Sequence, residues 1–135
     1  MINGINSREM ILEILLQIED GEHSHVAIRN ALSKYQFLPK QDRAFITRVC
    51  EGTLEYRIQI DYIINSFSKV TVDKMKPAIR EILRSAVYQL RYMDSVPDSA
   101  VCNEAVKLAQ RKGFYNLKPF VNGVLRTIAR DMDQV

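Results

Sequence analysis

Apolar residues recur along almost the whole chain at intervals of three and four residues, a spacing that places them on one face of an α-helix. Only five glycines and four prolines interrupt the chain. The pattern predicts an all-α fold of six or seven helices joined by short turns, with no β-sheet. The helical segments are residues 7–20, 24–35, 41–67, the stretch that Pro77 opens, the stretch between Pro97 and Gly113, and the stretch that Pro119 opens.

Local signals indicate where several of these helices begin, end or bend. Asn6, with Glu9 three residues later, resembles a capping pair, and Pro77 suits a first helical turn, where its missing N–H is harmless. Gly52 lies in the middle of the long segment 41–67 and costs about 1 kcal/mol relative to Ala, so we expect a bend or interruption near it. The clearest apolar stripe comprises Ile79, Ile82, Leu83, Ala86, Val87 and Leu90.

Length and composition indicate one compact domain, residues 1–135. The chain is 47% hydrophobic and 26% charged, close to the averages for globular domains. No stretch approaches the roughly 18 apolar residues of a membrane span, and the first residues do not resemble a signal peptide. We therefore expect a cytoplasmic protein without a membrane partner, in which Cys50 and Cys102 are buried, reduced thiols.

Few residues suggest chemistry within this chain. His23 and His25 lie two positions apart beside an expected turn, and no further ligands follow at metal-binding spacing. Without strands there is no glycine-rich loop of the kind that cradles nucleotides. The sequence therefore predicts no catalytic residue, no metal site, no cofactor and no enzymatic activity for the chain alone.

Charge is distributed unevenly, although the net charge is only +3. Residues 1–24 hold one basic and five acidic side chains, whereas residues 105–130 hold six basic side chains and no acid. Phe114 and Tyr115 lie among these cations, and RNA binding uses rings that stack on bases and cations that meet phosphates; alternatively, the rings close the core. The predicted RNA-binding residues are Lys107, Arg111, Lys112, Lys118, Arg126 and Arg130.

A second set of cations, Arg80, Arg84 and Arg91, falls on one face of the helix that Pro77 opens, with Tyr88 near them on the expected exposed side. These arginines are a possible secondary RNA-binding site. The favoured interpretation is that they pair with acids of the first or third helix, such as Glu51 or Glu55.

Three segments together resemble the NusB-type RNA-binding domain over nearly the whole chain. They are DRAFITRVCEGTL (42–54), IREILRSAVYQLRYMDSVPDSAVCNEAVKLAQRKG (79–113) and FVNGVLRTIAR (120–130). Two branches of this superfamily compete: the stand-alone NusB transcription antitermination factors, and the N-terminal domains of the bacterial 16S rRNA cytosine-C5 methyltransferases called RsmB, Sun or Fmu. The run YQLRYMDSVP leading into CNEAVKLA resembles the methyltransferase branch.

The resemblance implies two small helical bundles packed together and a non-catalytic role in holding RNA. In the methyltransferase branch the partners are 16S rRNA and a separate C-terminal domain, which binds S-adenosylmethionine and carries the catalytic cysteines; we expect this chain to be part of such a longer enzyme. In the antitermination branch an arginine-rich N-terminal segment grips RNA together with ribosomal protein S10. Only Arg8 matches that segment here.

Asn103, Glu104 and Asn122 belong to the resembling segments. Each is expected at or near the start of a helix, where its side chain would satisfy free backbone N–H groups. We therefore expect these three residues to have structural roles.

Overall fold

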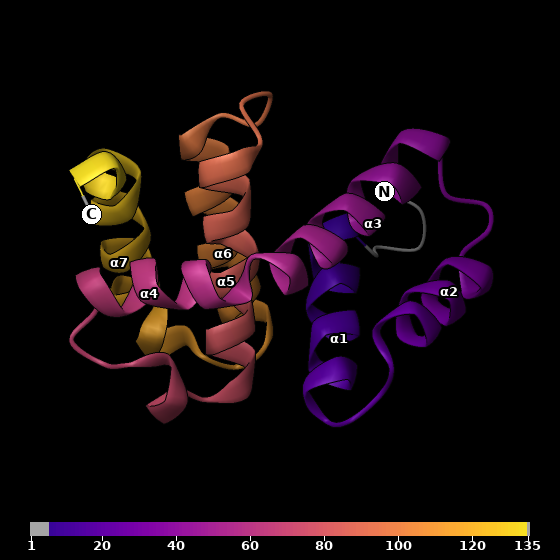
Figure 1. The fold of residues 1–135 in the computed structure, drawn as a ribbon, viewed down its shortest axis with the longest axis horizontal. Coiled ribbons are helices and arrows are strands. Elements are labelled where there is room, and N and C mark those ends of the chain that lie inside the picture. The colour runs from indigo at the N-terminus through magenta and orange to yellow at the C-terminus, as the bar shows by residue number, and fades with distance from the viewer. Residues whose placement is uncertain (1–5, 135) are drawn as a thin grey trace.

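The computed structural model describes residues 6–134, which form seven α-helices and no strand (Figure 1), so the all-α prediction is confirmed. The helices are α1 (Ser7–Glu19), α2 (Ser24–Lys34), α3 (Lys40–Glu55), α4 (Arg57–Phe67), α5 (Pro77–Tyr92), α6 (Asp98–Arg111) and α7 (Lys118–Asp131), with short 3-10 turns η2 (Val72–Lys74), η3 (Tyr115–Leu117) and η4 (Met132–Gln134).

The helices form two small bundles that share α5. Helices α1, α2 and α3 pack together at one end of the molecule, and α4, α6 and α7 pack around α5 at the other (Figure 1). Helix α5 also contacts α1 and α3 and thereby joins the bundles. Every residue from Glu81 to Leu90 is buried, including the polar ones, because neighbouring helices cover α5 on several sides.

Local signals in the sequence correctly marked several helix ends. The Asn6 side chain accepts a hydrogen bond from the Glu9 backbone N–H (2.7 Å) and caps α1. Pro77 and Pro119 lie in the first turns of α5 and α7. Gly113 adopts a positive φ of 88° directly after α6, a conformation that costs other residues energy.

The long segment is interrupted near Gly52, as predicted, but the break falls four residues later, at Tyr56 (φ −103°, ψ 20°), because α3 continues to Glu55. Gly52 instead permits close packing: a Cβ atom there would overlap the ring of Tyr88. Tyr88 is only 6% exposed, so its predicted exposed placement is wrong. The break at Tyr56 turns the chain so that α4 crosses α5.

The two cysteines are buried and the two histidines are exposed. Cys50 and Cys102 are buried free thiols, and burial raises the pKa of Cys50 to about 12. His23 and His25 are exposed at the start of α2. Among residues 6–134 there is no group of three His, Cys, Asp or Glu side chains arranged to hold a metal ion. No helix in the described range is both long and apolar enough to cross a membrane.

Candidate functional site

The six predicted cations are carried by two helices that pack against each other, α6 and α7, and by the connection between them. This set, called the basic face below, comprises Lys107, Arg111, Lys112, Lys118, Arg126 and Arg130. Its members differ in how far their charges are already used within the protein.

Lys107, Arg111 and Arg130 are exposed. Lys107 lies 3.5 Å from Glu104 of the same helix, and Arg130 pairs with the adjacent Asp131 (2.9 Å). Exposed pairs of this kind contribute little free energy and are readily exchanged for another anion. These three cations therefore remain available to a ligand.

Lys112 and Lys118 are more engaged. The Lys112 ammonium lies 3.5 Å from the carboxylates of both Glu9 and Glu13 on α1, so the acidic start of the chain partly neutralises its basic end. Lys118 donates to Gln110 Oε1 (2.8 Å) and lies 4.4 Å from the centre of the Tyr115 ring. Sequence reasoning missed the contact between α1 and Lys112 because its partners lie about a hundred residues apart.

Arg126 is held between two asparagines. Its Nε donates to Asn122 Oδ1 (3.1 Å) on α7, and its Nη2 donates to Asn103 Oδ1 (2.8 Å) on α6. The predicted capping roles are wrong, because α6 begins at Asp98 and α7 at Lys118. Both partners are neutral, so they fix the guanidinium in an exposed position without cancelling its charge.

Phe114 and Tyr115, the two rings in the connection between α6 and α7, lie in different environments. Phe114 is partly buried and packs against the hydrophobic core, whereas Tyr115 is 67% exposed. Only Tyr115 can therefore meet a ligand beside the cations.

Two of the three arginines on α5, Arg80 and Arg84, form ion pairs with acidic side chains, as predicted. Arg80 donates to Glu19 of α1 and to the carbonyl of Val72 (3.0 Å). Arg84 binds both carboxylate oxygens of Asp61 (2.8 Å each) and one of Glu81 (2.6 Å). The partners are thus Glu19, Asp61 and Glu81 rather than the predicted Glu51 or Glu55. Arg91 is half-buried, with its guanidinium 5.7 Å from the Tyr92 ring centre.

The cluster around Arg84 has two arginines and three carboxyl groups, so one proton makes it neutral. Burial and a hydrogen bond with Glu19 raise the pKa of Glu81 to about 8. Burial alone would raise the pKa of Glu19, but its hydrogen bonds with Arg80 and Glu81 lower it to about 2. The proton therefore resides on Glu81 near neutral pH.

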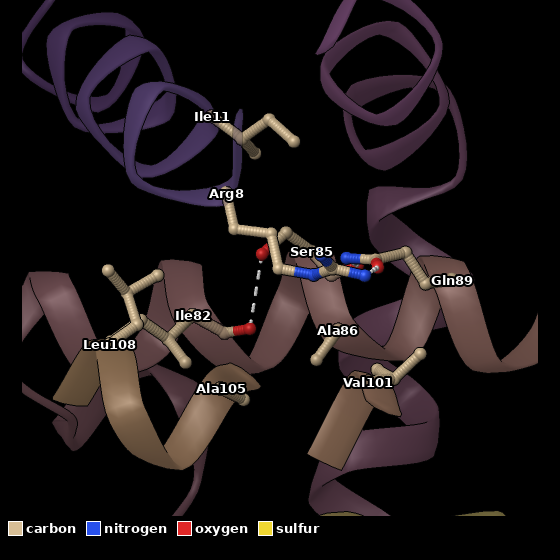
Figure 2. A pocket seen from close by; sticks show the side chains of 9 residues that line it. All are labelled: Arg8, Ile11, Ile82, Ser85, Ala86, Gln89, Val101, Ala105 and Leu108. Carbon is tan, nitrogen blue, oxygen red and sulfur yellow. Dashed lines mark hydrogen bonds between the residues drawn. The ribbon is translucent and has the colours of Figure 1, made fainter. Parts of the chain in front are cut away.

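Arg8 lies inside the interface between α1 and α5. Figure 2 shows its side chain in a small cavity, extended beside Ser85 toward Gln89. Its Nη2 donates to Gln89 Oε1 (3.2 Å), the guanidinium lies 5.2 Å from the Phe45 ring centre, and burial lowers its pKa. Arg8 is therefore a packing residue rather than a free surface cation.

The chain is similar in sequence to two groups of known proteins and similar in fold to a solved structure. A probable ribosomal RNA small subunit methyltransferase B of Bacillus subtilis is 34% identical over 92% of the chain, but the chain spans only 28% of its length. The transcription antitermination protein NusB of Bacillus velezensis is also 34% identical, and the chain covers 95% of it. The fold matches NusB in a solved complex with NusE and double-stranded RNA (TM-score 0.83, 21% identity, covering 92% of this chain and 93% of that one).

The NusB family as a whole matches residues 5–130, which is nearly the entire chain. The chain belongs to the NusB family.

Proposed function

We propose that this chain is a non-catalytic RNA-binding domain that contacts RNA through the basic face. The observation that carries the proposal is that Lys107, Arg111 and Arg126 project from two adjoining helices, and that no buried carboxylate within residues 6–133 pairs with them. Cations in such an arrangement bind phosphates and release the counterions that surround a nucleic acid, which favours association. Tyr115 adds an exposed ring beside them for an unpaired base.

The family comparison supports the same class of ligand. The structural relative was solved in a complex containing RNA, and the sequence relatives are named for transcription antitermination or for ribosomal RNA methylation. The methyltransferase name refers to ribosomal RNA directly. The proposed RNA surface on this chain rests on its own residues, because its identity to the RNA-bound relative is low.

Within this class we favour the N-terminal module of a 16S rRNA cytosine-C5 methyltransferase acting in the cytoplasm. A C-terminal domain of the parent enzyme would then bind S-adenosylmethionine and perform catalysis. The position of Arg8 supports this choice: the one residue that matches the arginine-rich segment of the antitermination branch is packed against Phe45 and Gln89 rather than free at the surface.

The second candidate is a stand-alone antitermination factor that binds RNA together with ribosomal protein S10. It is supported by the near-complete coverage of the Bacillus velezensis protein. The reading frame of the gene separates the two candidates. Continuation beyond the Val135 codon into a methyl-donor-binding domain supports the methyltransferase module, and a stop codon supports the antitermination factor.

The salt dependence of RNA binding tests the basic face. Replacing Lys107, Arg111 and Arg126 with Gln removes three charges while keeping a polar, unbranched side chain and a similar helix propensity. Each phosphate contact with a single strand contributes about 0.7 to the slope of log affinity against log salt. If all three cations contact phosphates of a single-stranded 16S rRNA fragment, the variant's slope should therefore be shallower by about 2.

A control variant with the same charge loss, Arg29, Lys34 and Lys40 to Gln, changes exposed cations on α2 and at the start of α3. It should bind with the parent's slope. Equal slopes for the parent and the basic-face variant would remove this face from the RNA site.

A further inference from the structure

Three tyrosine rings gather where α3, α4 and α5 meet. The ring of Tyr56, at the α3–α4 break, stacks on that of Tyr92 with centres 4.5 Å apart and planes 20° apart. Tyr88 completes the group, its ring centre 5.3 Å from that of Tyr92. The three rings are called the tyrosine cluster below. They lie outside the basic face.

The tyrosine cluster is anchored in the core. Tyr88 is buried and occupies the space that the missing side chain of Gly52 leaves on α3. The Tyr92 hydroxyl donates to Gln59 Oε1 on α4, and Arg48 donates to the Tyr92 carbonyl (3.0 Å). The inner rings are therefore held in place before any ligand arrives, which reduces the entropy lost on binding.

Exposure increases outward from Tyr88 to Tyr56. Tyr56 is 37% exposed although its ring already stacks on Tyr92. The Glu55 carboxylate raises the pKa of Tyr56, so the phenol remains neutral at physiological pH. The cluster thus presents to solvent a neutral aromatic ring backed by two further rings.

Cations and acids flank the tyrosine cluster in similar numbers. Arg91 lies over Tyr92, and its buried Nε finds no hydrogen-bond acceptor among the described residues. Arg48 and Arg57 are exposed on the adjoining helices, as are the acids Glu51 and Glu55. A ligand would therefore gain more from stacking than from net charge.

We propose that Tyr56 is a stacking site for an unpaired base of single-stranded RNA, with Arg48 and Arg91 beside it for the adjoining phosphates. This inference rests on the proposed RNA-binding function but concerns a second surface. The tyrosine cluster lies where α3, α4 and α5 meet, whereas the basic face is carried by α6, α7 and their connection; Figure 1 shows α4 crossing in front of α5 and α6 behind it. A base continues an aromatic stack regardless of its identity, which gives affinity without sequence preference.

Removal of the outer ring tests the site. Tyr56→Leu should weaken binding of single-stranded oligoadenylate by about 5- to 150-fold, the range for loss of one stacked base, without changing the salt slope. Tyr56→Phe keeps the ring and should bind like the parent. A stable abasic strand of the same length, which keeps the phosphates but has no bases, should bind the parent and Tyr56→Leu equally.

Phe37→Leu provides a matched control. Phe37 is an exposed ring after α2, in the other bundle, and its replacement should leave oligoadenylate binding unchanged. An equal loss in Phe37→Leu and Tyr56→Leu would overturn the assignment to Tyr56. If the parent binds RNA and Tyr56→Leu binds equally well, the stacking site is overturned while the basic face stands, and the cluster becomes a candidate protein contact. If the parent binds no RNA, both proposals fail.

A second variant reports stacking even if Tyr56→Leu folds poorly. The chain contains no tryptophan, so Tyr56→Trp introduces a single indole fluorophore at the site. Its emission should be quenched when oligoadenylate is added and unaffected by the abasic strand. Unquenched emission at saturating oligoadenylate would overturn the proposal.

Discussion

Gly52 illustrates how a single position is determined by a distant neighbour. In the middle of α3 a glycine weakens the helix, yet a side chain there would overlap the ring of Tyr88 on α5. Close approach of α3 to α5 depends on this missing side chain. The local cost is offset by burial of the Tyr88 ring.

We expect Gly52→Ala to lower the free energy of unfolding by about 1–3 kcal/mol, the usual range for overpacking, although Ala favours a helix by about 1 kcal/mol. Urea denaturation followed by circular dichroism measures the change. Gly123 in α7 is the control, because a Cβ there meets no atom within 4 Å, and Gly123→Ala should stabilise the protein. A Gly52→Ala protein as stable as the parent would show that the ring can move aside.

Leu83 lies fully buried at the centre of the α5 stripe. Leu83→Ala should cost about 2–5 kcal/mol through lost burial and the remaining cavity. Ile58→Ala, at a position that is 88% exposed, should stay within about 0.5 kcal/mol of the parent. Similar denaturation midpoints for the two variants would contradict the assigned core.

At the scale of the elements, the ion cluster of Glu19, Asp61, Arg80, Glu81 and Arg84 connects α1, α4 and α5. Glu81 is buried and protonated near neutral pH, so the negative charges that face Arg80 and Arg84 are those of the partly exposed Glu19 and Asp61. Removing Asp61 would leave the buried Arg84 guanidinium without its bidentate carboxylate partner. The cluster therefore fixes how the three helices meet.

The raised pKa of Glu81 makes stability depend on pH. Between its ordinary pKa of 4.5 and its folded value of about 8, the unfolded chain binds fewer protons than the folded chain, so the free energy of unfolding falls as pH rises through this range. Glu19 acts in the opposite direction: its pKa of about 2 adds stability above pH 4.5 that is lost as pH falls.

Glu81→Gln should therefore flatten the decline in stability from pH about 4.5 to about 8, as measured by urea denaturation at several pH values. Glu51→Gln, at an exposed position of α3, should keep the parent's decline. If the free energy of unfolding of Glu81→Gln fell with pH as steeply as that of the parent, the pH dependence would belong to another group.

Local chemistry in the sequence was enough to predict the element types. The Asn6 cap, Pro77, Pro119 and the stripe of α5 each depend on residues within one or two turns. An interruption near Gly52 was predicted, but its exact position at Tyr56 could not be, because it depends on how α4 crosses α5. Likewise, Glu19 and Arg80 are 61 residues apart, and only the fold shows that they meet.

At the scale of the whole molecule, contact between α1 and the end of α6 determines which cations of the basic face are neutralised. The acids of α1 neutralise Lys112, while Arg111 and Arg126 remain exposed. The sequence predicted the set of cations and their neighbouring helices. It could not rank them, because the ranking depends on Glu9, Glu13, Asn103 and Asn122, which reach these cations only in the folded chain.

A non-catalytic role predicts that residues 1–135 alone neither bind S-adenosylmethionine nor methylate ribosomal RNA. No cofactor loop or nucleophile group is built into the described helices, and the two cysteines are buried. Isothermal titration calorimetry measures cofactor binding directly. Micromolar binding of S-adenosylmethionine by this chain would contradict the proposal that cofactor binding belongs to a separate C-terminal domain.

The central claim is that RNA binds the basic face. Its most direct test is an NMR titration of the isotopically labelled chain with a single-stranded 16S rRNA fragment, following backbone amides and arginine side chains. The claim predicts that the largest shifts cluster on α6 and α7 around Lys107, Arg111 and Arg126, with the Arg126 Nε signal among them. Shifts confined to α1 and α2, or no shifts at saturating RNA, would contradict it.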